Sequence, residues 1–577
     1  MAVKTDTLPD VLLLYEEIVR MAQLYQEEGG AYQEELEALY EYALFLHGHG
    51  INDRAMVVCA LLDSFYDPDE PDPDQRDNRA RLNNFMGQLH WEREEYEDAE
   101  ARFRVSLDLY RRLAAEGEDA EPEAAELCGR LAEVMEATYR RGAAARLTLE
   151  AVTRYFRLEQ EEPGDYTREL AEACRRLAPY LDGRRTVPGT PPHPRAREFA
   201  ICMEALWDCV IDLDGVHEAE RNVAMDTLAD LLPEISFPDE GARLLREAED
   251  EARRKMEETA AGTAETAEKH TPSERAAVLA DICDHKAWEL IETNRIEEAE
   301  VLARRAVELY EPLAAADLAA YEPDLALSYH CLGIAITETR RPKETEAVFR
   351  RALDIFRRLA AENPSKYESY VADDCHDLGI LLRRIERYDE AENCYREELE
   401  IYRRLAAGDP VAHAVDMLFV CRDYAILLEY LRRPAEAEAL YREGLDFYCQ
   451  HGGGDFKGER SFANTKSSLA GLLRQTGRPA EAEALYREAL DSLRELAAQN
   501  PGAAEPWLAE TCYHYAFFEM HEGNHPAAAV KLLEEAVNLY HKYPQCETEE
   551  ARALEALIAA KQLRMEREGG NQGRYGM

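Results

Sequence analysis

The sequence predicts an all-α fold, an α-solenoid in which helical hairpins stack into a right-handed superhelix. Two observations carry this prediction: one segment recurs at a nearly constant period, and apolar residues recur at helical spacing inside each copy. Arg433 to Leu445 reads RPAEAEALYREGL, and Arg478 to Leu490 reads RPAEAEALYREAL. Self-similarity at a fixed period indicates a repeat architecture, in which each unit packs only on its neighbours.

Equivalent positions give the period of the repeat. They follow one another in steps of 46, 46, 46, 45 and 47 residues, at Ile296, Pro342, Tyr388, Pro434, Pro479 and Pro526. A chain of 577 residues could hold several domains, but an array of this kind makes one long solenoid the better prediction.

One half of each unit is predicted to be a long amphipathic helix. In the copy near the C-terminus the apolar stripe has spacings of three and one residues, at Ala482, Leu485, Tyr486, Ala489, Leu490, Leu493 and Leu496. Pro479 suits the first helical position, and Pro501 ends the helix because the residue before a proline avoids the helical region. We therefore expect a helix over 479–499, about 31 Å long.

The other half of each unit is predicted to be a second helix. Its apolar residues recur at spacings of four and three, at Val371, Cys375, Leu378, Leu382 and Ile385, and again 46 residues later at Met417, Cys421, Tyr424, Leu428 and Leu431. A short turn carrying Gly477 or Arg433-Pro434 joins the two helices. Such hairpins cannot bury their apolar faces alone, so we expect them to stack on each other.

The small and aromatic positions of these units resemble those of the tetratricopeptide repeat family. They are Leu378-Gly379, Ala391 and Tyr395 in one unit, and Tyr424-Ala425, Ala437, Tyr441 and Gly444 in the next. The resemblance covers at least Ala280 to Tyr543. The period is longer than the usual value of about 34 residues, as in the extended-helix variants of kinesin light chains and many bacterial regulatory proteins. The resemblance implies a protein-binding array with extra turns on the second helix.

The pattern divides the chain into five predicted regions. Tyr96-Glu-Asp-Ala99 begins a further clear copy, whereas the pattern decays after Arg141 and proline-rich or polar stretches interrupt it. The regions are 1–140, N-terminal repeats; 141–258, irregular helical repeats with a proline-rich basic loop at 183–194; 259–272, a linker; 273–545, a regular array of about six repeats; and 546–577, a capping helix and flexible tail.

The charge balance narrows the classes of partner. The chain has 117 Asp and Glu residues against 68 Lys and Arg residues, a formal net charge of −49. Such a surface repels phosphate backbones, which disfavours nucleic acid, although four arginines from Arg184 to Arg197 keep that class open. A protein or peptide partner, basic or neutral, is the better expectation. The sequence does not decide whether the chain forms homo-oligomers.

The N-terminal sequence and the cysteines favour a cytoplasmic protein. Val11 to Leu14 is the only uninterrupted apolar run near the N-terminus, so we expect neither a signal peptide nor a membrane span. The 13 cysteines form no C-x-x-C pair, which argues against a disulfide framework and a zinc ribbon.

His521-Glu522-Gly-Asn-His525 matches the H-E-x-x-H motif of zinc peptidases. That chemistry needs both histidines on one continuous helix face, whereas Gly523-Asn524 and Pro526 place the motif at an inter-helix turn. His47 and His49 lie at an equivalent turn and are interpreted as turn residues. A metallopeptidase is therefore kept as a remote alternative, with no metal site and no cofactor expected.

Cys283, Cys375, Cys421 and Cys512 raise the question of a cysteine nucleophile, because His376 follows Cys375. All four occupy the same repeat position, where a neighbouring unit has Tyr329. A small buried residue in the core explains this pattern better than catalysis does. We expect no catalytic residues.

The family resemblance implies that residues beside the apolar seam of each first helix line a concave groove that binds peptides or partner helices. By register the tentative groove residues are Asp281, Asp284, Trp288, His330, Asp373, His376, Arg383, Phe419, Arg422, Glu429, Asn464, Arg474, Tyr513 and Phe517, with Ile334, Ile380, Ile426 and Ser467 among them. Apolar anchors among a few orienting polar groups suit a peptide. The alternative is that these are simply solvated helix faces.

The sequence thus predicts a non-enzymatic scaffold, adaptor or regulatory subunit that binds a peptide or partner protein. One alternative is a regulator that responds to a small peptide ligand, with residues 141–258 as its second surface. A mobile basic loop at 183–194 that docks on the acidic surface as a gate is a further hypothesis.

Overall fold

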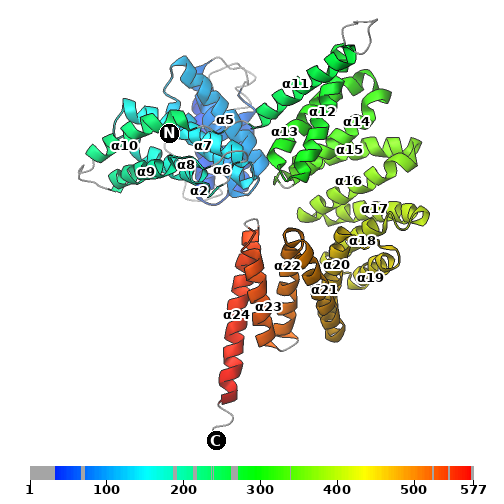
Figure 1. Ribbon diagram of the computed structural model, residues 1–577. Coiled ribbons are helices and arrows are strands. Elements are labelled where there is room, and N and C mark those ends of the chain that lie inside the picture. The colour runs from blue at the N-terminus through cyan, green and yellow to red at the C-terminus, as the bar shows by residue number, and fades with distance from the viewer. Residues whose placement is uncertain are drawn as a thin grey trace. The chain divides into compact units, whose positions relative to one another are not determined.

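A computed structural model of the chain describes residues 33–66, 72–185, 187, 192–211, 218–235, 237, 240–261, 271–337, 339–522, 525–543 and 546–572. The fold is all-α, an α-solenoid of stacked helical hairpins, as the sequence predicts (Figure 1). Parts of the predicted loop at 183–194, of the linker at 259–272 and of the C-terminal tail lie outside the described residues. Among the described helices, none combines the length and the apolar content that a membrane crossing requires.

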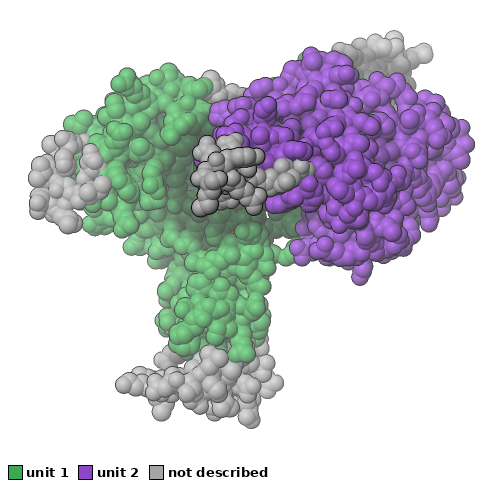
Figure 2. Space-filling view, turned by 90° about the horizontal axis from the view of Figure 1, so that it is seen from below, with its two compact units in different colours: residues 1–345 green, residues 346–577 purple. Residues whose placement is uncertain are grey.

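The chain divides into two compact units, Met1–Thr345 and Glu346–Met577 (Figure 2). The boundary between them lies inside one helix, α15 (Pro342–Glu362). The region boundaries that we infer from the sequence stay predictions.

Unit 1 begins with hairpins of similar construction. Their helices are α2 (Gln33–Gly48) with α3 (Asn52–Asp63), α4 (Pro73–Glu92) with α5 (Tyr96–Glu116), α6 (Glu121–Ala137) with α7 (Arg141–Glu161), and α8 (Thr167–Leu181) with α9 (Ala196–Ile211). Next, α10 (Glu218–Leu231) packs on α9, a 3₁₀ turn η1 (Leu232–Glu234) follows, and α11 (Glu240–Ala261) packs on the next hairpin. That hairpin is α12 (Pro272–Glu292) with α13 (Ile296–Ala316), and α14 (Leu318–Thr337) packs on α13.

Unit 2 continues the regular array. Its hairpins are α16 (Pro364–Arg384) with α17 (Tyr388–Gly408), α18 (Ala414–Tyr430) with α19 (Pro434–His451), α20 (Phe456–Gln475) with α21 (Pro479–Gln499), and α22 (Pro501–His521) with α23 (Pro526–Tyr540), followed by α24 (Glu547–Gln572). The six equivalent positions that define the repeat period are the first residues of α13, α15, α17, α19, α21 and α23. The predicted helix over 479–499 is confirmed.

The hairpin turns explain why the helices stop where they do. The turn residue has a left-handed backbone, with φ of 59°, 52°, 63° and 59° at Asn294, Arg340, Glu386 and Arg432, and 78° at Gly477. The next residue then donates its backbone N–H back into the first helix, as from Arg433 to the Leu428 carbonyl (2.8 Å). This arrangement satisfies carbonyls that the end of a helix leaves free.

Large aromatic rings fill the core at one position of the second helices α15, α17, α19 and α21, whereas α23 has Leu533 there. Phe349, Tyr395, Tyr441 and Tyr486 are each at most 1% exposed. Small residues make room for them: a Cβ atom added at Gly379 would lie 3.0 Å from the Tyr395 ring. Interiors packed to this density tolerate few voids, which explains the alternation of small and large residues along the repeat.

Ion pairs between successive repeats form a second periodic feature. The arginine just before a second helix reaches a glutamate of the second helix one repeat earlier, as Arg433 Nη1 does to Glu392 Oε1 (2.8 Å). The same contact joins Arg140 to Glu100, Arg341 to Glu300, Arg387 to Glu346, and Arg478 to Glu438. Although burial opposes it, the arginine lowers the pKa of Glu100, Glu300 and Glu392.

Within unit 1, second helices from two separate parts of the sequence meet at their N-termini. The carboxylate of Glu97, in the first turn of α5, accepts backbone hydrogen bonds from Lys343 (3.0 Å) and Glu344 (2.9 Å) at the start of α15. The guanidinium of Arg340 lies over the rings of Tyr96 and Tyr139, 5.9 and 5.5 Å from their centroids. We name this region the turn-end contact.

The turn-end contact is reciprocal. The carboxylate of Glu297, in the first turn of α13, accepts hydrogen bonds from the backbone N–H groups of Gly142 (2.9 Å) and Ala143 (3.0 Å) at the start of α7. Helix α7 has no acidic residue in its own first turn. A carboxylate stabilises free N–H groups at a helix N-terminus. Glu297 therefore supplies α7 with the acidic group that most other second helices carry in their own first turn.

The last helix packs on the final hairpin through a narrow stripe. Leu557 of α24 is buried against the final hairpin, together with Ala516 and Leu533. Leu554 and Ile558 of the same helix are 42% and 58% exposed.

Candidate functional site

The first helices of the regular array carry the groove residues that the sequence predicts. One register position holds Asp284 in α12, His330 in α14, His376 in α16 and Arg422 in α18. His330 is buried, and the other three are half-buried. Each of these polar side chains therefore needs a hydrogen-bond or ion-pair partner, and that partner differs from repeat to repeat.

His376 lies in a buried charge network. Its Nδ1 atom is 3.0 Å from Glu398 Oε1, and its Nε2 atom is 3.6 Å from Asp423 Oδ2. Burial favours the neutral imidazole, but the two carboxylates raise the pKa of His376 to about 9. Arg422 donates to both oxygens of Asp423 (3.0 Å each) and holds its pKa low despite its burial.

The Asp284 carboxylate has a hydrogen-bond partner on only one of its two oxygens. The Ser328 hydroxyl donates to its Oδ2 atom, while its Oδ1 atom is buried and accepts no hydrogen bond. Burial, reinforced by Asp281 and Asp324, raises the pKa of Asp284 to about 7. The carboxyl therefore titrates near neutral pH.

Aromatic rings and cations pair at further predicted groove positions within each unit. The rings of Trp288 and His330 are 5.6 Å apart, and the guanidinium of Arg474 lies 5.1 Å from the Phe517 ring centroid. Further pairs are Arg422 over Phe419, Arg383 over Tyr430, Tyr402 donating to Asp373, and Tyr441 donating to Glu429. Asp281 is exposed, and Asn464 and Tyr513 are half-buried. Many of the predicted groove residues thus already bind one another.

The four cysteines at the repeated position lie in the core and not on this surface. Cys283, Cys375, Cys421 and Cys512 are wholly buried, as expected for core residues. Burial raises the pKa of the Cys283 thiol to about 12 and raises the pKa values of the other three. A thiolate is the reactive form, so these thiols are inert at neutral pH.

Two concavities that the sequence reading missed lie over the N-terminal repeats. The first has a volume of about 670 Å³ and is lined by α4, α5, α6, α7 and α8. The second, of about 660 Å³, is lined by α2, α4, α5 and α6. Gln88 lines both concavities, so they form one surface, which we name the N-terminal groove.

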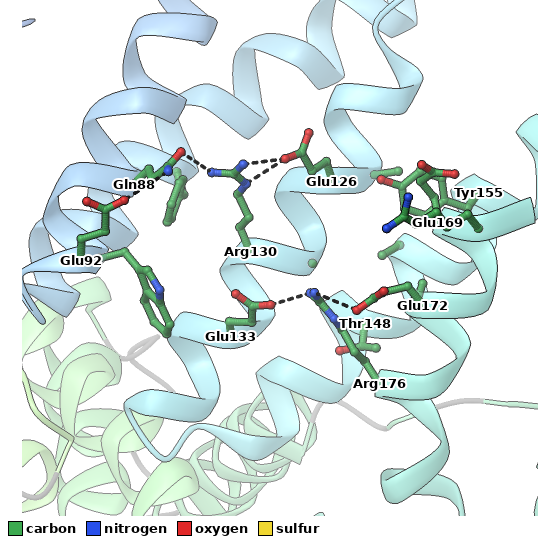
Figure 3. A pocket seen from close by; sticks show the side chains of 17 residues that line it. Gln88, Glu92, Glu126, Arg130, Glu133, Thr148, Tyr155, Glu169, Glu172 and Arg176 are labelled. Atoms are coloured by element: carbon green, nitrogen blue, oxygen red, sulfur yellow. Dashed lines mark hydrogen bonds and ion pairs between the residues drawn. The ribbon is translucent and has the colours of Figure 1, made fainter. Parts of the chain in front are cut away.

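The first concavity combines an apolar floor with charged walls. Trp91, Phe103, Gly129 and Tyr155 contribute to the floor. Figure 3 shows Gln88 and Glu92 facing Glu169 and Glu172 across α6. The labelled cations are already paired, since Arg130 donates to Glu126 and Gln88, and Arg176 contacts Glu133 and Glu172.

The second concavity is strongly acidic. Its lining includes the carboxylates of Asp74, Asp77, Glu118, Asp119 and Glu123, and Arg81 is the one Lys or Arg residue in that lining. Arg81 lies 3.9 Å from Asp77 and 5.9 Å from the centroid of the Tyr40 ring. A third concavity of about 290 Å³ adjoins it and adds Glu37 and Glu41.

The sequence held a weak signal for the N-terminal groove. Tyr96 to Tyr110 is recognisable as a repeat copy, and the half-buried positions of the preceding helix include Asn84 and Gln88. The next two first helices, α6 and α8, diverge from the repeat pattern, so their register could not be read from the regular array. Gly129, which opens the floor, resembles an ordinary helix glycine.

The candidate metal motif is interrupted in the structure. Helix α22 ends at His521 and α23 begins at Pro526, so His521 and His525 do not share one helix face. His525 Nδ1 lies 3.0 Å from Glu519 Oε2. His47 lies in the last turn of α2 and His49 just after that helix, where they contact Asn52 and the Phe45 carbonyl.

Among the described residues, one group has a geometry that could hold a metal ion. Potential ligand atoms of His90, Glu95 and Asp98 lie within 4.8 Å of one another. Lys343 Nζ already contacts Asp98, and Arg93 Nε lies 3.4 Å from Glu95. Cations of the chain itself thus neutralise this group.

The arginines in the described part of the basic loop form ion pairs with carboxylates. Arg184 pairs with Asp182, Arg185 with Glu136, and Arg195 with Glu198 and Glu234. These contacts join the arginines to Asp182 beside α8 and to carboxylates of α6, α9 and η1. The gate that the sequence suggested stays a hypothesis.

Comparisons with known proteins support a repeat array. Residues 324–404 match a family model described as tetratricopeptide repeat, and residues 462–501 match a second model of that description. No curated protein matches the chain. Among solved structures, the chain is similar to a crystal structure of BtubC (BKLC) from P. vanneervenii, with 21% identity and a TM-score of 0.34 over 45% of this chain and 92% of that one.

A second similar structure comes from a functional characterization of Pseudomonas aeruginosa pilF. The identity is 16% and the TM-score 0.30, over 50% of this chain and 99% of that one. At such TM-scores neither similarity carries an argument about what this chain binds.

Proposed function

Because the chain is a tetratricopeptide repeat protein, we propose that it is a non-enzymatic scaffold or adaptor that holds a segment of a partner protein in its N-terminal groove. The observation that carries the proposal is the pair of joined concavities over α2, α4, α6 and α8. Concave sites with an apolar floor and a few polar groups are typical of binding sites.

The first helices of the regular array are the second candidate surface for the partner. There the polar groups are largely satisfied by one another, as in the network of His376, Glu398, Asp423 and Arg422. A ligand at that surface would have to break existing pairs, whereas the acidic part of the N-terminal groove has few pairs to lose. This difference favours the N-terminal groove.

A pair of glycine variants tests the proposal. Gly129→Leu would fill the floor of the first concavity, because an added Cβ meets only the flexible end of Arg176 at 3.3 Å. Gly471→Leu is the matched control: it is also a half-buried glycine of a first helix, and its added Cβ would lie 3.5 Å from the Tyr486 hydroxyl.

The measurement is quantitative capture from native lysate at about 0.15 M ionic strength, where non-specific long-range attraction is screened. We expect Gly129→Leu to reduce capture of a specific partner at least tenfold and Gly471→Leu to leave it unchanged. Both variants must first show the wild-type melting curve. Loss with Gly471→Leu alone would move the site to the regular array, and capture unchanged by either variant would reject both grooves.

A ligand-responsive regulator is the second candidate function, and one chain of contacts favours it. Trp91 lines the first concavity, its ring lies 5.4 Å from that of Tyr96, and Arg340 stacks on Tyr96 in the turn-end contact. A ligand that moves Trp91 would therefore disturb this contact. Altered hydrogen exchange at Lys343 and Glu344 upon binding would support the regulator, and unchanged exchange there would contradict it.

A further inference from the structure

Several carboxylates of the second concavity have no cationic partner among the described residues. Along the arrays, arginines match glutamates across successive repeats, as in Arg350 with Glu390 and Arg357 with Glu397. In the groove, no Lys, Arg or His side chain of the described residues lies within ion-pair distance of Asp74, Asp119 or Glu123. Their charge is available to a ligand.

The closeness of these carboxylates affects the pKa values of Asp77 and Glu123. Burial raises the pKa of Asp77, and Asp74 raises it further in spite of Arg81. Burial also raises the pKa of Glu123, with Asp77 and Asp119 adding to the effect. The repulsion between these carboxylates would be relieved by a cation placed among them.

Asp77 and Glu123 approach one another from different helices. Asp77 projects from α4 and Glu123 from the first turn of α6, and both line the second concavity. After burial, these two carboxylates make the largest contributions to raising the pKa of the Tyr110 hydroxyl. The second concavity therefore brings both carboxylates to one hollow, where a cationic group would be held.

A further unsatisfied group lies in the same lining. The Oδ1 atom of Asn84 is buried and accepts no hydrogen bond. A buried acceptor without a donor destabilises the structure, and an N–H donor from a ligand would remove that cost. Asn84 stands on α4 between Asp77 and Gln88, so it connects the acidic concavity with the apolar one.

We propose that the N-terminal groove takes a basic, partly apolar polypeptide segment. A Lys or Arg side chain lies between Asp77 and Glu123, a backbone or side-chain N–H donates to Asn84, and an apolar side chain enters the hollow beside Trp91 and Tyr155. This inference rests on the proposed function and specifies the chemistry of its partner. Electrostatic complementarity of this kind sets specificity and the rate of encounter more than total affinity.

The test is a selection of random dodecapeptides displayed on phage against the full chain, followed by fluorescence anisotropy with the recovered peptides. We expect recovered peptides to contain at least one Lys or Arg together with an aromatic or branched aliphatic residue. Binding should weaken about tenfold in the double variant Asp77→Asn, Glu123→Gln. Asn84→Ala should weaken it severalfold.

A matched control separates a site from general attraction to an acidic protein. Asp354→Asn, Glu400→Gln removes the same charge from exposed carboxylates of α15 and α17 and should change affinity less than twofold. Equal losses in both double variants would reduce the interaction to non-specific attraction and overturn the inference. Recovery of acidic or uncharged peptides, or of none that distinguishes wild type from the groove variant, would also overturn it.

The outcomes also separate this inference from the proposed function. If Gly129→Leu abolishes capture of a partner while Asp77→Asn, Glu123→Gln does not affect it, the groove binds a partner of different chemistry. If neither variant affects capture, the groove itself is the wrong site.

Discussion

Asp284 and His376 occupy the same position of two repeats, and burial acts on them in opposite ways. Burial of the poorly matched Asp284 carboxyl raises its pKa to about 7. His376 keeps its proton because Glu398 and Asp423 flank it, and its pKa rises to about 9. The sequence placed both residues at the groove register, but their partners come from other helices and could not be read from the repeat.

Asp284→Asn should stabilise the protein above neutral pH. The wild-type carboxyl has a higher pKa in the folded state than its reference value of 3.8, so wild-type stability falls as pH rises from about 4 to 7. The variant should gain up to about 4 kcal/mol in this range and stay constant above it. Hydrogen exchange of α12 at pH 4 and 8 checks this. Asp281→Asn, at an exposed neighbour, should show no such slope; a pH-independent effect of Asp284→Asn would contradict the account.

His376→Gln should destabilise unit 2 at neutral pH by about 3 kcal/mol, because it leaves the buried Glu398 carboxylate without its cation, while Asp423 keeps Arg422. The histidine contribution is fully present below about pH 6.5 and is lost as pH rises towards 9. Urea unfolding at pH 6.5 and 9.5 should therefore show a deficit only at the lower pH. His285→Gln, at a side chain 80% exposed, serves as the control. A deficit of equal size at both pH values would show that His376 acts through packing alone.

At the scale of helices, the sequence predicted the elements well and their long-range contacts poorly. The second helices of the array begin at the marked repeat positions because proline, arginine and the turn residue are local signals. The turn-end contact could not be foreseen, since Glu97 and Glu297 resemble the first-turn acids of other second helices. Their partners lie 246 and 155 residues away.

The inter-repeat ion pairs should differ in strength with their burial. Arg341 and Glu300 are 5% and 9% exposed, whereas Arg478 and Glu438 are 38% and 23% exposed. Arg341→Leu leaves the buried Glu300 carboxylate with Arg304 as its remaining partner and should cost about 3 kcal/mol. Arg478→Leu should cost less than about 1 kcal/mol. Comparable shifts in the two unfolding midpoints would refute this dependence on burial.

Two glycines at the second position of a helix test the turn-end contact. Glycine to alanine in a helix normally stabilises by up to about 1 kcal/mol. Gly502→Ala should do so, since an added Cβ meets only Asn500 Oδ1 at 4.0 Å. Gly142→Ala should not, because its Cβ would lie 2.9 Å from Glu297 Oε1 and displace the carboxylate that caps α7. Thermal melting with hydrogen exchange of α7 distinguishes them; equal stabilisation would argue against the contact.

At the scale of the whole chain, charge dominates the surface. The formal net charge is −49, so many acidic residues have no basic residue to pair with. Repulsion among exposed carboxylates weakens the folded state, and salt screens it over about 10 Å at 0.1 M. The melting temperature should therefore rise between 20 mM and 0.5 M NaCl. A falling melting temperature would mean that the exposed ion pairs outweigh the repulsion.

The regular array was predictable because its period repeats local signals, whereas the N-terminal groove was not. Asn84, Gly129 and Glu123 take part in the groove through packing between repeats that have lost the common pattern. The sequence indicated a concave binding surface and placed it on the regular array. The structure adds the N-terminal groove, where several carboxylates have no cationic partner among the described residues.

The most direct test of the central claim is hydrogen–deuterium exchange of the full chain with and without a captured partner. The account predicts slowed exchange in α4, α6 and the first turns of α8, the helices that line the N-terminal groove. Protection confined to α16, α18, α20 and α22, with α4 and α6 unchanged, would contradict it and place the partner on the regular array.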